Sequence, residues 1–368
     1  MAEHRRSSRL RRSAPPRPPR AQVAAVMVGA LALTGVGSAL TWDTLAPALS
    51  AVAIPDLGSH PDYEGEGHGE KMVKVPEGSS GFDVGRILAE NDVVASAPAF
   101  NELARLEPRI ERLQPGTYVM KNEMSSVAAI EALLDEGNLR VDKVTVPEGL
   151  WVDETFDRLA RGTDVPREDY DALEPEDVGL PEEAGGELEG WLFPSTYNFD
   201  IDDDARTQVR KMVEQTQTEL RREEVARKDW QRMLTVASIV EAESSGQADR
   251  GKVASVVFNR LEQDMPLGMD STIHFIHQER GRAATSTEQR KADSPYNTYE
   301  RTGLPPGPIN SPGRAALEAA VDPDDTDFLY FVAVNPLTGE TKFSQTFGEH
   351  QRYVEMFNRW CQQNEEMC

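Results

Sequence analysis

The sequence predicts an α+β protein that begins with a single transmembrane helix, and three patterns carry this prediction. Residues 21–42 contain no charged side chain. Residues 75–94 and 146–165 both begin Val-Pro-Glu-Gly and continue into an amphipathic pattern, so each predicts a strand, a turn and a helix. Residues 229–244 carry apolar side chains at helical spacing, which predicts a buried helix.

The charge distribution restricts the partners. The 368-residue chain has a formal net charge of −24, yet its first twenty residues hold seven arginines against one acidic residue. The rest of the chain is therefore strongly acidic, and an acidic surface repels phosphates. Nucleic acid is not an expected partner. Residues 1–20 are expected to form a basic tail in the cytoplasm.

Residues 21–42 are long enough for one membrane crossing, because 22 residues at about 1.5 Å each cover a hydrocarbon core of roughly 30 Å. The arginine-rich flank on the N-terminal side predicts a cytoplasmic N-terminus and an extracytoplasmic body. A cleaved signal peptide is the alternative, but its apolar region would normally be about 7–15 residues long. We therefore expect an uncleaved span in the cell membrane.

A small module is expected after the span. Residues 43–70 are rich in Pro, Gly and acidic residues and predict a flexible linker. Order is expected to resume with the first Val-Pro-Glu-Gly unit, in a module of residues 71–140. Within it, residues 115–120 predict a turn into a strand, and residues 125–136 predict a helix.

Residues 141–368 are expected to form the main domain. An acidic loop at residues 166–189 precedes three aromatic residues in a short segment, Trp191, Phe193 and Tyr197. Core packing explains such a cluster best, and an aromatic platform for sugar rings is the alternative. Further helices are predicted at residues 202–222 and 252–262.

The candidate catalytic groups are two carboxylates, Glu241 and Glu243, at the end of the predicted buried helix. Desolvation there favours the protonated form of a carboxyl, which a general acid needs. With Val240 at the centre of the apolar stripe, Glu243 lies about 60° to one side and Glu241 about 100° to the other. Helical periodicity therefore does not choose between them. The alternative is that both simply lie at a helix end, although the helix dipole disfavours acids there.

A loop further along the chain has the composition of a carbohydrate cleft. Residues 296–299 alternate two tyrosines with an amide and a hydroxyl, and GLPPGPINSPG follows. Prolines stiffen this loop, and glycines let its backbone approach a ligand closely. A tight structural loop is the alternative. No metal site is expected, because the only cysteines, Cys361 and Cys368, have no further ligands at suitable spacing.

Together these motifs resemble the membrane-anchored endolytic murein transglycosylases of the MltG/YceG type. The matching pieces include ASIVEAES, KVASVVFNRL, YNTYERTGLPPGPINSPG and FLYFVA, with TVPEG, PGTY and EGWLFPSTY upstream. The resemblance extends over about residues 71–359 and includes the preceding membrane span. It implies a LysM-like module at residues 71–140 and a YceG-like α+β catalytic domain at residues 141–368.

The resemblance also implies a reaction. The family cleaves the β-1,4 bond between N-acetylmuramic acid and N-acetylglucosamine in nascent peptidoglycan, forms 1,6-anhydro ends and so acts as a terminase of glycan elongation. It places the catalytic acid at Glu243, with Glu241 as the fallback or as a neighbour that tunes the site. The substrate-binding residues would be Asn259, Arg260, Asp270, Tyr296, Asn297, Thr298, Tyr299 and Asn310.

The remaining expectations concern partners and alternatives. No cofactor is expected; the partners are peptidoglycan strands and the membrane, with peptidoglycan synthases as candidates. Arg260 or Asp270 could instead form a structural ion pair. The family usually has Gln two residues before Asp270 and Pro directly after it, whereas this chain has Gly268 and Ser271. The rival functions are a non-catalytic, membrane-tethered glycan-binding scaffold and a hydrolase.

Overall fold

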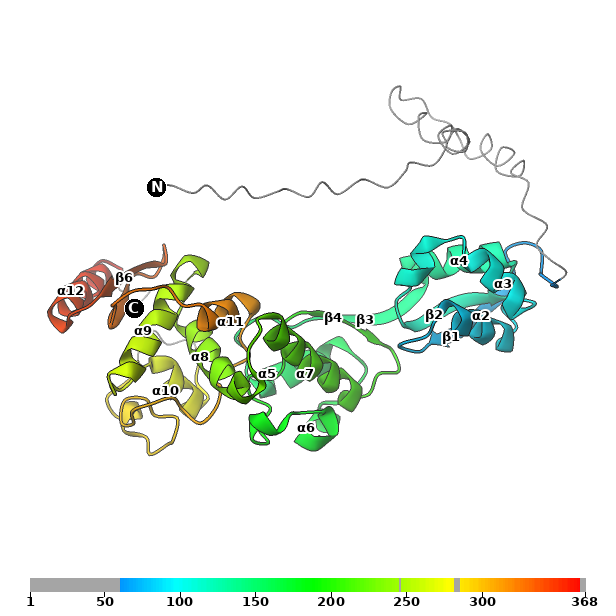
Figure 1. Cartoon of the computed structure of the whole chain (residues 1–368). Coiled ribbons are helices and arrows are strands. Elements are labelled where there is room, and N and C mark those ends of the chain that lie inside the picture. The colour runs from blue at the N-terminus through cyan, green and yellow to red at the C-terminus, as the bar shows by residue number, and fades with distance from the viewer. Residues whose placement is uncertain (1–59, 245, 281–284, 365–368) are drawn as a thin grey trace, which may run out of the picture. The chain divides into compact units, whose positions relative to one another are not determined.

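The computed structural model describes residues 60–364, apart from residue 245 and residues 281–284 (Figure 1). The predicted basic tail, the predicted transmembrane helix and most of the predicted linker lie outside this part of the chain. Among the described residues, no helix is both long enough and apolar enough to cross a membrane.

The N-terminal module is built on two antiparallel strands. Val75 in the first strand lies opposite Gly116 in the second, and two helices lie between the strands in the sequence. Val73, Leu88 and Phe100 pack together in its core. The elements are β1 (His68–Val75), α2 (Gly81–Glu90), α3 (Ala97–Ala104), β2 (Gly116–Asn122) and α4 (Ser126–Leu134).

Ordered contacts begin earlier than the sequence predicted. Asp62 accepts hydrogen bonds from the backbone N and the Oγ of Ser126, at 3.1 and 2.8 Å. The carbonyl of Pro61 accepts one from the hydroxyl of Ser96 at 2.9 Å. The last part of the predicted linker, residues 60–67, therefore packs against the module, because its polar groups bond the starts of two helices.

Both Val-Pro-Glu-Gly units form a strand, a turn and a helix, as predicted. In the first unit, the Ser80 side chain accepts a hydrogen bond from the Asp83 backbone and Asp83 accepts one from the Ser80 backbone, a capping box that begins α2. In the second unit, the helix begins after Trp151, whose N–H donates to Glu154 Oε2 at 2.9 Å. Asp153 lies in the first turn of this helix.

The two strands of the module belong to a four-stranded sheet in the order β1-β2-β3-β4, which continues into the part of the chain that follows the module. Strands β2 and β3 share only two residue pairs, 117 with 140 and 118 with 139. The buried Asp200 accepts a hydrogen bond from the Thr117 hydroxyl at 3.1 Å across this junction. The two added strands are β3 (Leu139–Thr145) and β4 (Thr196–Asp200).

Three helices cover these strands, with Phe156, Tyr170, Phe199 and Val213 in their shared core. They are α5 (Val152–Gly162), α6 (Arg167–Asp171) and α7 (Ala205–Arg222). The predicted aromatic cluster lies at the edge of this region. Trp191 is fully buried and donates to Gln231 at 2.9 Å, so core packing, the preferred interpretation, is confirmed for it.

The C-terminal region is organised around helix α8 (Trp230–Glu243), in which every residue from 234 to 240 is buried. Helix α11 packs along it, and helices α9 and α10 also pack against it (Figure 1). The remaining elements are α9 (Arg250–Glu262), α10 (Asp270–His277), α11 (Arg314–Val321), β5 (Tyr330–Asn335), β6 (Glu340–Ser344) and α12 (Phe347–Gln363).

Candidate active site

The candidate acid Glu243 is the last residue of α8. The buried residues before it, ending at Val240, fix the position of this helix end. The side chain of Glu243 is partly buried, and its Oε1 accepts a hydrogen bond from the backbone N–H of Ser271 at 3.3 Å. Because Ser271 lies in the first turn of α10, this carboxyl bridges the end of one buried helix and the start of another.

Opposing influences act on the protonation of Glu243. Burial is the largest and raises its pKa, and the nearby charge of Asp270 acts in the same direction. Ser271 and the positive charge of Arg260 act in the opposite direction because they stabilise the carboxylate. The net direction is upward, so Glu243 keeps its proton to a higher pH than an exposed glutamate, as a general acid requires.

Glu241 is held by other groups. Its Oε1 accepts a hydrogen bond from Arg250 at 2.9 Å, and its Oε2 accepts one from the backbone N–H of Gly313 at 3.1 Å. Arg250 also contacts Glu148 at 3.3 Å. Burial raises the pKa of Glu241 as well. Because both of its oxygens bond protein groups, this geometry favours Glu243 as the acid and Glu241 as a bridging residue.

Asp270 takes part in an ion pair, which was the structural alternative for this residue. Its carboxylate lies 3.0 Å from Arg290 and accepts hydrogen bonds from the hydroxyls of Tyr299, at 2.8 Å, and Thr285. The Arg290 guanidinium also lies over the Tyr299 ring, 4.6 Å from its centre. These contacts orient Tyr299 and the start of α10 beside Glu243.

Arg260 lies close enough to Glu243 to favour its ionised form. Its Nε donates to the carbonyl of Leu329 at 2.6 Å, and its Nη1 donates to that of Leu267 at 2.5 Å. The guanidinium lies 5.1 Å from the ring centre of Tyr330. Burial lowers the pKa of Arg260. This arginine therefore joins two loops and also contributes positive charge to the site.

Four other predicted substrate residues bond the main chain. The amide of Asn259 donates to two carbonyls at 2.7 and 2.9 Å, and that of Asn297 to two at 2.9 and 2.8 Å. The amide of Asn310 donates to the backbone of α8 at 2.8 Å, and the Thr298 hydroxyl accepts a backbone N–H at 3.0 Å. These contacts favour a role in holding the loops, and direct binding by these residues stays a prediction.

Two predicted substrate residues line cavities: Asn259 lines one, and a different one is lined by Tyr296. Tyr296 is partly buried, and its ring centre lies 4.9 Å from that of Phe275 in α10. Pro306 and Gly307 of the proline-rich loop line the same cavity, which has a volume of about 690 Å³. The loop and the tyrosine segment that the sequence singled out therefore meet at one surface.

Comparison with known proteins agrees with this geometry. The profile of the YceG-like family matches residues 73–356. The chain belongs to the YceG-like family. The resemblance carried by the sequence motifs is thus confirmed, and the mixed α+β character of a YceG-like domain is present in the structure.

Two proteins of known name and one solved structure are similar to this chain. An endolytic murein transglycosylase of Bacillus subtilis (strain 168) is 32% identical over 77% of this chain and 84% of its own length. One from Streptococcus pneumoniae (strain D39) is 27% identical over 77% of this chain and 57% of its own length. The crystal structure of a YceG-like protein from Listeria monocytogenes superposes with a TM-score of 0.51 at 29% identity, over 77% of this chain and 98% of that one.

The sequence did not single out three residues that complete this YceG-like site. Arg250 and Glu148 form the network around Glu241, and the only signal was that Glu148 belongs to the second Val-Pro-Glu-Gly unit. Ser271 had been noted only as a departure from the family pattern. A proline there would have no N–H to donate to Glu243, so this hydrogen bond depends on the departure.

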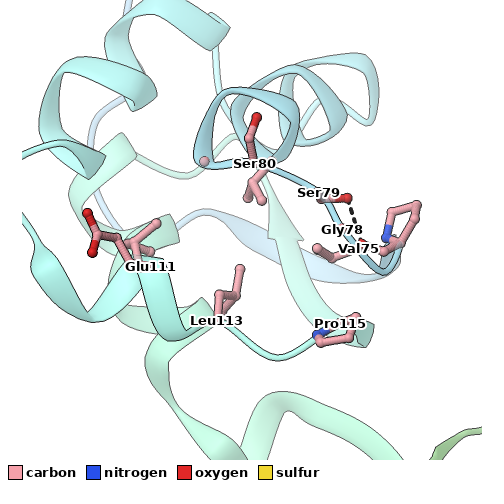
Figure 2. A pocket seen from close by; sticks show the side chains of 11 residues that line it. Val75, Gly78, Ser79, Ser80, Glu111, Leu113 and Pro115 are labelled. Atoms are coloured by element: carbon pink, nitrogen blue, oxygen red, sulfur yellow. Dashed lines mark hydrogen bonds between the residues drawn. The ribbon is translucent and has the colours of Figure 1, made fainter. Parts of the chain in front are cut away.

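A second cavity lies in the N-terminal module, between the turn after β1 and residues 110–115 (Figure 2). Its volume is about 280 Å³. The Ser79 hydroxyl donates to the Pro76 carbonyl at 2.7 Å and closes the turn, while Glu111 and Leu113 lie on the opposite side. The first Val-Pro-Glu-Gly unit therefore borders a cavity of its own.

The candidate site and the rest of the described chain contain no group of three or more His, Cys, Asp or Glu side chains placed to hold a metal ion. One of the two cysteines, Cys368, lies outside the described residues. The carboxylates of Glu243 and Glu241 bond protein groups, as described above.

Proposed function

We propose that this protein is a membrane-anchored endolytic peptidoglycan lytic transglycosylase. It cleaves the β-1,4 bond between N-acetylmuramic acid and N-acetylglucosamine in nascent glycan strands, leaves 1,6-anhydro ends and so terminates elongation. Membership of the YceG-like family and the names of its relatives support the reaction class. The observation that carries the proposal is the position of Glu243, whose pKa is raised by burial at the junction of α8 and α10.

The reaction needs one carboxyl that first gives and then takes a proton. Protonated Glu243 donates its proton to the bridging oxygen as the bond from that oxygen to C1 of the muramic acid breaks. The 6-hydroxyl of the same sugar then forms a bond to C1, and its proton passes to the Glu243 carboxylate. Glu243 ends in its starting form, and no water is consumed.

The neighbouring acids fit this scheme. Glu241 is paired with Arg250, and Asp270 is paired with Arg290. Ordinary glycosidases need a second free carboxylate as nucleophile or base. An internal hydroxyl as nucleophile removes that requirement, so the two ion pairs are compatible with the reaction.

The surface beside Glu243 is proposed to bind the glycan. Tyr299, whose hydroxyl donates to Asp270, and Tyr296, on the cavity wall, offer ring surfaces, and Arg260 offers charge close to the acid. Asn259, Asn297, Thr298 and Asn310 are proposed to act mainly by holding the loops that carry these groups.

The N-terminal module is proposed to be LysM-like. It would bind the same glycan strand at a position away from the cleaved bond. Its strand–helix–helix–strand order and the cavity beside the Ser79 turn support this role. Leu113→Ser, which alters that cavity, should raise KM for glycan strands and leave kcat unchanged. An unchanged KM in the folded variant would refute a binding role for this groove.

Residues 21–42 are proposed to anchor the protein, with the catalytic body outside the cytoplasm. The uncharged run and its arginine-rich flank support this orientation. Protease added to intact, wall-stripped cells should digest the body. Protection of the body would contradict the orientation, and release of a soluble form would indicate a cleaved signal peptide.

Product analysis tests the proposed reaction directly. Purified protein should convert uncrosslinked glycan strands into fragments with 1,6-anhydromuramyl ends, which are lighter by one water than hydrolysis products. Mass spectrometry separates the two kinds of end. Reducing ends would make the protein a hydrolase, and binding without cleavage would favour the non-catalytic scaffold.

A further inference from the structure

The last helix, α12, contributes no buried residue to the core. It packs on the two-stranded sheet of β5 and β6 (Figure 1). Its start is fixed by Thr346, whose side chain accepts a hydrogen bond from the backbone N–H of Glu349 at 3.3 Å. The first turn of the helix carries Phe347 and His350, two side chains to which the proposed reaction gives no role.

Three rings meet where α12 begins. The imidazole of His350 is stacked on the ring of Tyr330, the first residue of β5, with ring centres 5.2 Å apart and 27° between the ring planes. The ring of Phe347 lies 5.8 Å from that of Tyr330 and 6.0 Å from that of His350. We call these three residues the Tyr330 cluster. Because two of its rings come from α12, this helix helps to fix the start of β5.

The start of β5 in turn holds Arg260 of helix α9. The guanidinium lies 5.1 Å from the ring centre of Tyr330, and its Nε donates to the carbonyl of the preceding residue, Leu329, at 2.6 Å. Its Nη1 donates to the carbonyl of Leu267 at 2.5 Å. No described residue accepts a hydrogen bond from Nη2. The orientation of this guanidinium therefore depends strongly on the position of Tyr330 and Leu329.

Arg260 connects the Tyr330 cluster electrostatically with the candidate acid. Its positive charge lowers the pKa of Glu243 and also that of His350. Burial is the larger cause for His350, whose Nδ1 is buried without a hydrogen-bond partner among the described residues. On α12 itself, Glu349 and Arg352 lie 3.6 Å from each other. This environment favours a neutral imidazole, which stacks on Tyr330 without repelling Arg260.

We propose that His350 is a positioning residue of the catalytic site, which holds the Arg260 guanidinium beside Glu243 through the ring of Tyr330. This role rests on the proposed function, in which Glu243 is the acid, and it gives α12 a part in that function. His350 exchanges no proton with the substrate. Its ring fixes Tyr330 and thereby keeps one positive charge close to the carboxylate that forms when Glu243 gives up its proton.

The position of Arg260 affects the pH range of the reaction in a defined direction. The charge of Arg260 and the groups of Ser271 stabilise the Glu243 carboxylate, whereas burial and the charge of Asp270 stabilise its protonated form. If Arg260 moves away, the pKa of Glu243 rises. The protonated acid then persists to a higher pH, and the alkaline limb of the kcat profile moves upward. An opposite charge nearby typically changes a carboxyl pKa by about 1–3 units.

The test measures the rate of glycan-strand cleavage by the full-length protein over about pH 4–9, whichever ends the products carry. His350→Ala removes the ring and should lower kcat about tenfold and move the alkaline limb upward by about one unit. His350→Phe restores a flat ring and should recover most of kcat, with the limb within about 0.3 unit of wild type. Gln351→Ala, an exposed neighbour on the same helix, is the matched control and should change neither quantity.

A double-mutant cycle separates positioning from a general effect on folding. Arg260→Met removes the charge and should move the limb in the same direction as His350→Ala. Because His350 acts through Arg260, adding His350→Ala to Arg260→Met should change kcat by less than about twofold. Additive losses would overturn the proposal. Circular dichroism checks that each variant is folded, and Tyr330→Leu, which should move the limb upward as well, replaces His350→Ala if that variant does not fold.

The outcome is separable from that of the proposed reaction. Reducing ends, or no cleavage by the wild type, would refute the reaction only. A carbodiimide modifies protonated carboxyls, so its labelling of the Glu243 peptide, followed by mass spectrometry across the same pH range, reports the pKa without any cleavage. The labelling midpoint should rise in His350→Ala and stay unchanged in Gln351→Ala. An unshifted midpoint in folded His350→Ala, or an equal loss of kcat in His350→Phe, would overturn the positioning role.

Discussion

The two Val-Pro-Glu-Gly units show how one local sequence serves two different purposes. Both place a glycine at positive φ, +77° at Gly78 and +76° at Gly149. A Cβ on Gly78 would meet no atom within 4 Å. The N–H of Gly149 donates to the carbonyl of Ser311 at 2.8 Å, and its carbonyl accepts from Arg280. The glycine of the first turn has free space around it, whereas the glycine of the second is hydrogen-bonded to the catalytic region.

The glutamates of the two units differ in the same way. Both glutamates are exposed, but Glu148 in the second unit contacts Arg250, the partner of Glu241. The turn geometry thus follows from local sequence, but its role follows from what packs against it. We infer that changes in the second unit affect catalysis, while equivalent changes in the first affect only binding or local stability.

The largest expected effect concerns the two acids near the second unit. Glu243→Gln cannot exchange a proton and should lower kcat by about 10²–10⁴-fold, the usual range for losing a positioned acid–base group. Glu241→Gln should lower it less, because Glu241 bonds Arg250 and Gly313. Cleavage rates of glycan strands measure both. Full activity in Glu243→Gln with loss in Glu241→Gln would reverse the assignment.

The next effect is a pH dependence of stability at Glu189, which accepts the N–H of Val152 at the start of the helix after the second unit. The pKa of Glu189 is raised from 4.5 to about 8 on folding, chiefly by burial. Between these values the folded protein holds a proton that the unfolded chain has lost. The free energy of unfolding should therefore fall as pH rises, by up to about 1.4 kcal/mol per pH unit.

Chemical denaturation of wild type and Glu189→Gln at pH 5, 6, 7 and 8 isolates this contribution. The charges that act on Glu189 are those of Arg280 and Glu154, and both remain in the variant. The difference between the two proteins should grow in favour of Glu189→Gln as pH rises. Parallel curves would show that Glu189 titrates normally.

A smaller effect is expected at the ion pair behind the second unit. Arg250→Met leaves Glu241 buried without its charged partner, which should cost about 1–3 kcal/mol of stability. The control beside the first unit is Lys74→Met. Lys74 is half-exposed and lies 3.7 Å from Asp200, so its loss should cost no more than about 1 kcal/mol. An equal loss of stability in Arg250→Met and Lys74→Met would show that the ion pairs beside the two units contribute equally.

The smallest effect tests the turns themselves. Gly78→Ala and Gly149→Ala should each cost about 1–2 kcal/mol, because both positions need positive φ. Only Gly149→Ala should also reduce kcat, since its new methyl group would contact Glu241. Thermal unfolding and cleavage assays on the same samples check both statements. A loss of kcat in Gly78→Ala would show that the first unit also supports catalysis.

Much of the fold was predictable because it depends on short-range patterns. The helix at residues 229–244 was evident from its apolar spacing, and both strand–turn–helix units followed from the repeated motif. Helix starts were less predictable. Trp151 precedes the second helix although it is not a usual capping residue, and its backbone N–H donates to Glu154.

The sequence by itself determined the candidate acids, the family resemblance and the polar loop at residues 296–313, since residue type and spacing carry that information. The resemblance placed the acid at Glu243 with Glu241 as the fallback, and this choice stays a prediction. Only the tertiary structure shows what each carboxyl bonds, because Arg250, Gly313 and Ser271 are distant in sequence or invisible to periodicity. The same is true of the 690 Å³ cavity lined by Glu189, Phe275 and Tyr296. Its walls come from segments more than a hundred residues apart, and burial, which sets the pKa of its carboxyl, exists only once they are packed together.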